Sequence, residues 1–405
     1  MVEAFKRVKS NKGAGGVDGI EIEGFKTQLD AAWNGVKTAI LEGSYRPEVV
    51  RRVEIPKPNG GIRLLGIPTL MDRLIQQAIG QELVKLYDES FSESSYGFRP
   101  GKSAHQAVVQ AKEYVNAGNS YVVDLDLDQF FDRVNHDYLM NLLSQKIEDK
   151  RVLKLIHRYL RAGVMKDGIV KANTTGMPQG GPLSPILSNI LLDVLDKELE
   201  NRGHRFIRYA DDCSVYVKTK RAGERVMASI SKFIEKELKL KVNVVKSAVT
   251  RPWKTKLLGY SFYFGKGEKR LKIAKESISK YKDKIREITS RSKPVAMYRR
   301  YELLRQLNVG WYNYFHLNEA RNVIEELDEW VRRRIRLCYW KQWRRVKTRI
   351  KMLEKIGAPS RNVYQWGNTR KGYWRIANSP ILNTTLNKTF LQKEGYLSLK
   401  EISSH

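Results

Sequence analysis

Along residues 1–120 the hydrophobic pattern alternates between helical and extended stretches. Residues 21–42 and 69–88 carry apolar side chains at helical spacing, and a third helix is expected after the loop "SYGFRPGKS". Between the first two lies "VVRRVEIPKPNGGIRLLGIP", which predicts a β-hairpin. Its turn is residues 58–61, because Pro-Asn-Gly-Gly is strong hairpin chemistry. This part of the chain therefore mixes helices and strands.

From residue 121 onward the pattern first continues and then changes. "YVVDLDLDQFFD" (121–132) predicts a strand that runs into acids, and "RFIRYADDCSVYVK" predicts a hairpin. "SPILSNILLDVLDKELENRG" predicts a helix, with Pro185 near its first turn and Gly203 at its end. A helix near 222–239 and short strands around 242–250 and 257–264 follow. Beyond residue 275 the pattern is helical, so we expect an α+β half followed by a helical half.

The composition limits the class of protein. The chain has 405 residues, of which 41% are hydrophobic, so it should fold into two or three domains. Its two cysteines cannot form a disulfide framework, which favours a reducing cytosol. No apolar run is long enough to span a membrane, and the first residues lack the apolar core of a secretory signal.

Net charge indicates the kind of partner. The formal charge is +30, and residues 251–405 hold 36 Lys or Arg against 13 Asp or Glu. Such an excess predicts a polyanionic partner. The basic stretch also carries many Trp and Tyr residues, which can stack on bases, so nucleic acid is favoured over a membrane surface.

Two groups of acids are candidates for catalysis. In an extended strand Asp124, Asp126 and Asp128 would share one face, and Asp211 and Asp212 would lie at or beside a hairpin turn. Each group alone is also compatible with an exposed strand face or an ordinary turn. If one of the first group meets the pair, three carboxylates would crowd together and require neutralisation. Two Mg²⁺ ions would supply it, with Mn²⁺ as a substitute, and would suit in-line phosphoryl displacement.

The sequence gives little support for other catalytic motifs. "GKS" at 101–103 resembles the end of a phosphate-binding P-loop, but position 96 is Tyr96 where that motif requires glycine. The six histidines are scattered, and no Cys/His cluster or Ser-His-Asp order is evident. "GAGGVDG" at 13–19 follows no strand and is interpreted as a flexible loop.

Three motifs in order resemble the palm of a reverse transcriptase. They are "DLDQFFD" (126–132), in which five residues separate Asp126 from Asp132, "MPQGGPLSPILSN" (177–189), which fits Q-G-x-x-x-S-P, and "YADD". "RRVEIPKPNGGIRLLGIPTLMDRLIQQAI" (51–79) and "SYGFRPGKSAHQAV" resemble the finger segments of group II intron reverse transcriptases. "VNVVKSAV" and "LLGYSF" resemble their closing palm motifs, and "GWYNYF" (310–315) resembles their thumb, or maturase domain X. The resemblance covers essentially the whole chain and favours the compact bacterial class without an endonuclease domain.

The resemblance implies a right-hand polymerase with an antiparallel palm sheet and a helical thumb. It places fingers at 1–110, palm at 111–275, thumb or domain X at 276–355 and a small, basic, DNA-binding-like helical tail at 356–405. It also implies an RNA-directed DNA polymerase that copies intron RNA into cDNA and assists splicing and retrohoming. The partners implied are group II intron RNA, an RNA template with a DNA primer, dNTPs and target DNA, without a membrane; a homodimer is left open.

The resemblance assigns roles to individual residues. Asp126, Asp211 and Asp212 would be the catalytic residues that hold the two metal ions, whereas Asp124 aligns with no catalytic position. Phe131 would exclude a 2′-hydroxyl by steric clash, although simple core packing is the alternative. Lys57 and Arg63 would grip the triphosphate of the incoming nucleotide. Gln179 and Gly180 would shape the floor beneath the nascent base pair, and Lys246 would lie near the pyrophosphate.

The stretch 330–350 packs nine basic residues around Tyr339, Trp340 and Trp343. The two tryptophans would share a helix face, either anchoring the helix to a core or contacting nucleic acid. The residues expected to bind nucleic acid are Arg332, Arg333, Arg336, Arg344 and Arg345. Two alternatives to an intron reverse transcriptase remain: a domesticated or CRISPR-linked reverse transcriptase, and a non-enzymatic RNA-binding splicing factor.

Overall fold

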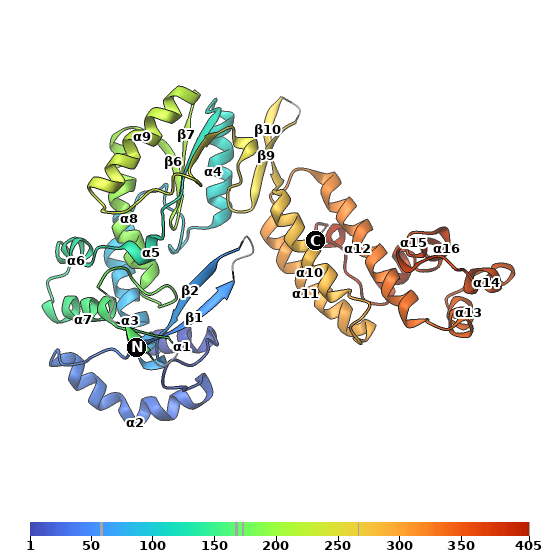
Figure 1. The fold of residues 1–405 in the computed structure, drawn as a ribbon, viewed down its shortest axis with the longest axis horizontal. Coiled ribbons are helices and arrows are strands. Elements are labelled where there is room, and N and C mark those ends of the chain that lie inside the picture. The colour runs from blue at the N-terminus through green and yellow to red at the C-terminus, as the bar shows by residue number, and fades with distance from the viewer. Residues whose placement is uncertain (57–59, 167–168, 172–173, 266, 405) are drawn as a thin grey trace. The chain divides into compact units, whose positions relative to one another are not determined.

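The computed structural model describes residues 1–404 except 57–59, 167–168, 172–173 and 266. The chain divides into two compact units, Met1–Pro252 and Trp253–His405, each with its own hydrophobic core. The first unit mixes helices and strands, and the second is helical apart from one hairpin (Figure 1). The predicted division into an α+β part and a helical part is therefore found. The predicted domain boundaries stay predictions.

The central sheet of the first unit has the order β6-β7-β3-β8, and all its neighbours are antiparallel. Its strands are β3 (Tyr121–Leu125), β6 (Arg205–Tyr209), β7 (Asp212–Val217) and β8 (Ala248–Thr250). β-branched and aromatic residues dominate these strands, as suits a sheet with buried faces. The segment predicted as a strand at 121–132 is shorter, because the chain leaves the sheet after Leu125 and turns into the short helix α5 (Phe130–Arg133).

Helices cover this sheet on both faces. On one face, Arg208 of β6 contacts α8 (Ser184–Asn201), and Val123 of β3 packs beneath α9 (Lys220–Lys236). Residues alternate between faces along a strand, so Tyr216 lies on the other face, where it contacts Tyr114 of α4 (Ala104–Asn116). The sheet is thus the middle layer of a three-layer arrangement of helices and strands.

A second sheet in the same unit has the order β2-β1-β4-β5. β1 (Val50–Pro56) and β2 (Ile62–Ile67) form the predicted hairpin, whose turn lies partly outside the described residues. The parallel strand β4 (Val164–Lys166) and its neighbour β5 (Ile169–Lys171) extend the sheet and were not expected from the sequence.

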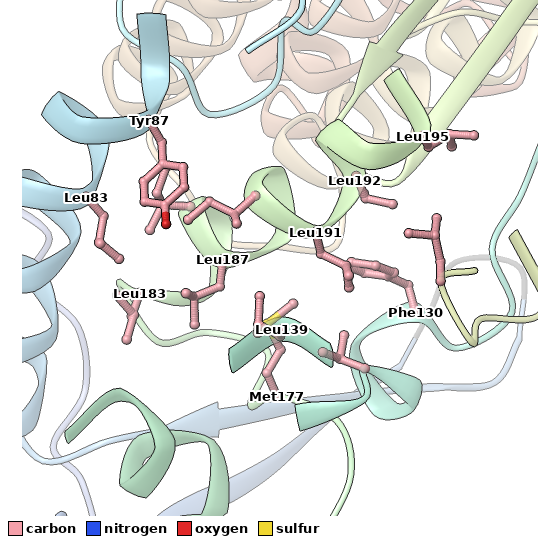
Figure 2. Close-up of a cluster of buried hydrophobic side chains, with 14 of the residues drawn as sticks. Leu83, Tyr87, Phe130, Leu139, Met177, Leu183, Leu187, Leu191, Leu192 and Leu195 are labelled. Carbon is pink, nitrogen blue, oxygen red and sulfur yellow. The ribbon is translucent and has the colours of Figure 1, made fainter. Parts of the chain in front are cut away.

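Two further helices, at residues 70–87 and 136–144, contact α8. The predicted helices at 21–42 and 69–88 are confirmed, whereas three others were not predicted. The helices and short 3-10 turns are α1 (Val2–Ser10), α2 (Ile22–Leu41), α3 (Leu70–Tyr87), η1 (Asp88–Ser90), α6 (His136–Ser144), α7 (Lys150–Arg161) and η2 (Pro252–Lys254). Figure 2 shows leucines along α8 meeting Leu83 and Tyr87 of α3 as well as Phe130 and Leu139. This core joins α3, α5 and α6 to α8.

The second unit begins with the hairpin β9 (Tyr260–Gly265) and β10 (Glu268–Ile273). Its helices are α10 (Lys275–Ile288), α11 (Met297–Phe315), α12 (Arg321–Gln342), α13 (Val346–Lys355), α14 (Ser360–Gly367), α15 (Tyr373–Ile376), α16 (Pro380–Thr385), α17 (Lys388–Lys393) and α18 (Leu399–Ile402). The core contains Trp340 and Trp343, which are 1% and 4% exposed. The two tryptophans therefore anchor this part of the chain to the core, as one of the two interpretations of their spacing predicts. Among the described residues, no helix is long and apolar enough to cross a membrane.

Candidate active site

The hairpin between β6 and β7 presents two acids at its turn. Tyr209 pairs with Asp212, so Ala210 and Asp211 form a two-residue loop. Ala210 has a φ of 57°, a left-handed conformation that hairpin loops need and that usually selects glycine. Asp211 is half-buried and Asp212 is exposed. The turn predicted from "YADD" is therefore a tight hairpin with both carboxylates at one edge of the sheet.

Asp126 reaches the same edge from β3. Leu125 pairs with Cys213, so the next residue, Asp126, lies beside the start of β7. Its backbone is held by the loop before β8: the Asp126 N–H donates to Ser247 Oγ (3.0 Å), and the Asn243 N–H donates to the Asp126 carbonyl (2.8 Å). Sequence reasoning missed these two supporting residues. Their only signal was their position on either side of Lys246.

The electrostatics of this edge suit a cation. Burial raises the pKa of Asp126, the Lys246 ammonium acts in the opposite direction, and the negative charge of Asp211 raises the pKa further. Lys246 Nζ lies 3.7 Å from Asp126 Oδ1 and is largely exposed. The Asp126 and Asp211 carboxylates are therefore close enough to repel, and a bound divalent cation would relieve that repulsion.

Within the described part of the chain, no three His, Cys, Asp or Glu side chains are arranged closely enough to hold a metal ion as they stand. The carboxylate oxygens of Asp126, Asp211 and Asp212 still fit the ligand preference of Mg²⁺, which takes one or two carboxylates together with water and substrate phosphates. The residues present therefore fit the implied ions.

The other two acids of the 121–132 segment have separate roles. Asp124 accepts a hydrogen bond from Ser214 Oγ on the neighbouring strand (2.7 Å), and Asp128 forms an ion pair with Arg133 (2.8 Å). Because β3 ends at Leu125, the strict alternation that would keep Asp128 on the face of Asp126 does not apply. Asp124 and Asp128 thus have side-chain partners of their own, while the charge of Asp128 still contributes to raising the pKa of Asp126.

A pocket of about 290 Å³ lies between β2, α5 and the loop that precedes α8. Phe131 and Gln179 both line it. Phe131 also packs edge-on against Phe130, with ring centroids 5.2 Å apart, so it contributes to the core and to the pocket wall. Phe131 thus both packs in the core and lines the pocket. Its role in selecting the sugar stays a prediction.

Gly180 permits the close approach expected of it. The Gly66 N–H of β2 donates to the Gln179 carbonyl (2.7 Å), and a Cβ on Gly180 would lie 2.7 Å from the Gly66 carbonyl oxygen. With a φ of 122°, Gly180 also adopts a conformation that other residues rarely adopt. This loop is therefore fixed against the hairpin that carries Arg63.

The remaining predicted nucleotide contacts are less defined. Arg63 is exposed on β2 and pairs with Ile55 of β1, and Lys57 lies outside the described residues. "GKS" at 101–103 has a structural role instead of a phosphate-binding one, because Ser103 caps α4 in a capping box and Lys102 pairs with Glu93.

The arginines predicted to bind nucleic acid differ in exposure. Arg344 and Arg345 are exposed, Arg332 is half-buried, and Arg333 donates to the Trp374 carbonyl and stacks on that ring, 3.8 Å from its centroid. The prediction for Arg336 is revised. Its side chain is buried and donates to the Leu386 carbonyl and to Asn383, and burial lowers its pKa to about 10.

Comparison with known proteins agrees with this geometry. Residues 55–262 match the family model "Reverse transcriptase (RNA-dependent DNA polymerase)", and residues 278–357 match "Group II intron, maturase-specific domain". The chain is 32% identical to the Escherichia coli protein YkfC over 62% of its length and 76% of YkfC. It is 36% identical to the group II intron-encoded protein LtrA of Lactococcus lactis over 48% of its length and 32% of LtrA. A telomerase structure from Candida albicans superposes with a TM-score of 0.46 at 12% identity, covering 87% of this chain and 69% of that one.

The chain therefore belongs to the reverse transcriptase family, whose members are RNA-directed DNA polymerases with a right-hand architecture. The second match identifies it further as a group II intron-encoded reverse transcriptase and maturase. Binding to RNA follows from both matches.

Proposed function

We propose that this chain copies its own intron RNA into cDNA by metal-assisted nucleotidyl transfer and binds the same RNA to assist splicing and retrohoming into target DNA. The observation that supports catalysis is the meeting of Asp126, whose pKa burial and Asp211 raise, with the acidic turn at one edge of the palm sheet. A non-enzymatic splicing factor would not need these like charges to lie together.

The carboxylates of Asp126, Asp211 and Asp212 hold the ions in this proposal. When bound, two Mg²⁺ ions, or Mn²⁺ in their place, activate the attacking 3′-hydroxyl and stabilise the leaving oxygen. Lys246, beside Asp126, is available to give a proton to the departing pyrophosphate. The site thus supplies carboxylates that hold the ions and one ammonium group, that of Lys246, beside the departing pyrophosphate.

The pocket beside α5 receives the incoming dNTP. Phe131 forms the wall against which a 2′-hydroxyl would clash, and the Gln179–Gly180 backbone, fixed to Gly66, forms the floor. Arg63 of β2 contacts the triphosphate. Lys57, which lies outside the described residues, has the same role in this proposal on the family resemblance alone. In this arrangement the palm spans 111–275 and is preceded by fingers at 1–110.

Residues 276–355, as a thumb, and 356–405, as a DNA-binding-like tail, contact nucleic acid. A basic pocket of about 390 Å³ in this part of the chain is lined by Arg291, Lys293 and Lys341. Arg291 and Lys341 also lie over the ring of Tyr373, 5.1 and 5.4 Å from its centroid. Clustered cations beside an aromatic ring suit a phosphate backbone with stacked bases.

The test is extension of a DNA primer on an RNA template with dNTPs and Mg²⁺. Wild type should extend the primer, and Asp211→Asn should not, while both bind the RNA with similar affinity. RNA binding and splicing without extension by the wild type would favour a splicing factor. Substantial extension by Asp211→Asn would overturn the assignment of the acids.

A further inference from the structure

An arginine on the catalytic hairpin is buried completely. Arg208 of β6 is 0% exposed, and its guanidinium forms a two-pronged pair with Asp196 of α8, which is equally buried. Arg208 Nε lies 2.7 Å from Asp196 Oδ1, and Arg208 Nη2 lies 2.6 Å from Asp196 Oδ2. Such a fork is geometrically specific, so it fixes the orientation of the guanidinium.

The other donors of Arg208 reach three different segments. Nη1 donates to the Ala210 carbonyl (3.0 Å) and to Asn189 Oδ1 (2.9 Å), and Nη2 donates to Ser95 Oγ (2.7 Å). Ala210 is the residue in the left-handed conformation that directly precedes Asp211. One fixed guanidinium therefore ties the acidic turn to α8 and to the segment that contains Ser95.

That segment also holds the turn from its other side. The Tyr96 N–H donates to the Arg208 carbonyl, and the Arg208 N–H donates to the Ser94 carbonyl, both at 2.9 Å. A Cβ built on Gly97 would lie 2.3 Å from the Ala210 nitrogen. Asn189 of α8, which already contacts Arg208, donates to the Gly97 carbonyl (2.9 Å). The turn is thus enclosed between Arg208 and the backbone of Gly97.

We propose that Arg208 and the Ser94–Gly97 backbone are positioning elements that set the location of Asp211 and Asp212 by fixing the Ala210 peptide. The proposal rests on the proposed function, in which these carboxylates hold the ions. Ligands must be held to within about 0.5 Å of their productive geometry, and a displacement of about 1 Å can cost roughly 10²-fold in rate. A two-residue loop at the end of a hairpin has no such rigidity by itself.

The alternative is that the Arg208–Asp196 pair only stabilises the fold. Replacing Arg208 leaves Asp196 buried without its partner, so that substitution alone cannot separate the two roles. Gly97→Ala separates them, because it leaves the ion pair intact and places a methyl group against the Ala210 backbone. Gly35→Ala on α2 is the matched control, since nothing lies within 4 Å of its Cβ.

The experiment compares wild type, Gly97→Ala, Gly35→Ala and Arg208→Lys in three measurements. These are kcat and KM for dNTP in RNA-templated extension, Mn²⁺ binding by electron paramagnetic resonance, and the melting temperature. We expect Gly97→Ala to lower kcat by roughly 10²-fold and to weaken Mn²⁺ binding, with KM and RNA affinity little changed. Gly35→Ala should match wild type in kcat, KM and Mn²⁺ binding, and its melting temperature should be equal or slightly higher, because alanine favours a helix over glycine by about 1 kcal/mol.

Arg208→Lys keeps the charge but lacks the fork that reaches both Asp196 and Ala210, so a folded Arg208→Lys protein should share the defects of Gly97→Ala. Wild-type kcat and Mn²⁺ affinity in folded Gly97→Ala would overturn the proposal, and so would wild-type values in Arg208→Lys. If Arg208→Lys does not fold, Gly97→Ala decides. If wild type extends no primer, the proposed function fails, and Mn²⁺ binding still tests whether Gly97 and Arg208 position the acids.

Discussion

The charged groups of the two units are positioned in opposite ways. In Met1–Pro252 a few acids lie at the edge of a sheet, and hydrogen bonds from distant segments fix them, as with Asp126 and the loop before β8. In Trp253–His405 many cations cover the helices, and Arg344 and Arg345 are exposed. Catalysis needs exact placement of single groups, whereas affinity for a polyanion depends on the number of contacts. The first unit should therefore be sensitive to single substitutions and the second only to several together.

The largest effect is expected from Asp126→Asn. The change removes a charge that would hold an ion, and metal ions contribute several kcal/mol of transition-state stabilisation. Because 1.36 kcal/mol corresponds to a tenfold change in rate, extension should fall roughly 10³-fold or more. Single-turnover primer extension with Mg²⁺ measures the loss. Asp124→Asn is the matched control, because Asp124 bonds to Ser214 within the sheet, and its activity should remain within a few-fold of wild type. Equal losses in both variants would contradict the separation of these two acids.

Phe131→Val tests a wall of the nucleotide pocket in the same unit. If the ring excludes the 2′-hydroxyl, the smaller side chain should relax discrimination against rNTPs by roughly 10–100-fold, the scale on which pocket shape discriminates. The measurement is the ratio of kcat/KM for a dNTP and its matching rNTP. Phe130→Leu is the control, because Phe130 is buried beside Phe131 and does not line the pocket. Unchanged discrimination in Phe131→Val would leave this residue with core packing alone.

Local patterns in the sequence predicted the elements well and the long-range contacts poorly. The helices α2, α3 and α8 and the acidic hairpin follow from periodicity and turn chemistry, which act over a few residues. The burial of Trp340 and Arg336 depends on which helices pack over α12, and helical spacing cannot give that. Arg208 could have been noticed as a cation between apolar residues of the strand 205–209. Its side-chain partners Asp196, Asn189 and Ser95, however, lie 12 to 113 residues away, and only the fold brings them together.

The second unit should respond more gradually. Replacing Arg344 and Arg345 with Gln removes two exposed cations, and each lost phosphate contact should reduce the log–log salt slope of RNA binding by roughly 0.7–0.9. Titrating RNA binding against salt for wild type and the double variant measures this. Lys232→Gln with Lys236→Gln on α9 removes the same charge from the first unit and should leave the slope nearer to wild type. Superimposable slopes for wild type and the arginine variant would place the RNA elsewhere.

The smallest effect concerns Asp193, a half-buried acid of α8 whose pKa burial and the neighbouring Asp196 raise to about 6. Because this folded-state pKa lies above the ordinary value of 3.8, the folded protein binds the proton more tightly than the unfolded chain. The contribution of Asp193 to stability is therefore greatest below about pH 4 and is lost as the pH rises through about 6. Asn is neutral and keeps an oxygen to accept from the Ser92 N–H, which lies 3.2 Å from Asp193 Oδ1. Asp193→Asn should thus remove this pH dependence and raise the free energy of unfolding at pH 7 by about 1 kcal/mol, after allowance for solvent screening.

Urea unfolding at pH 4 and pH 7 measures this effect. Asp30→Asn, at an exposed position of α2, makes the same charge change and should leave the unfolding free energy almost unaltered at both values. If Asp193→Asn instead destabilises the protein at pH 7, the ionised carboxylate must be stabilised by its surroundings. The Arg208 guanidinium would then stabilise the charge of Asp193 in addition to that of Asp196, with which it is paired.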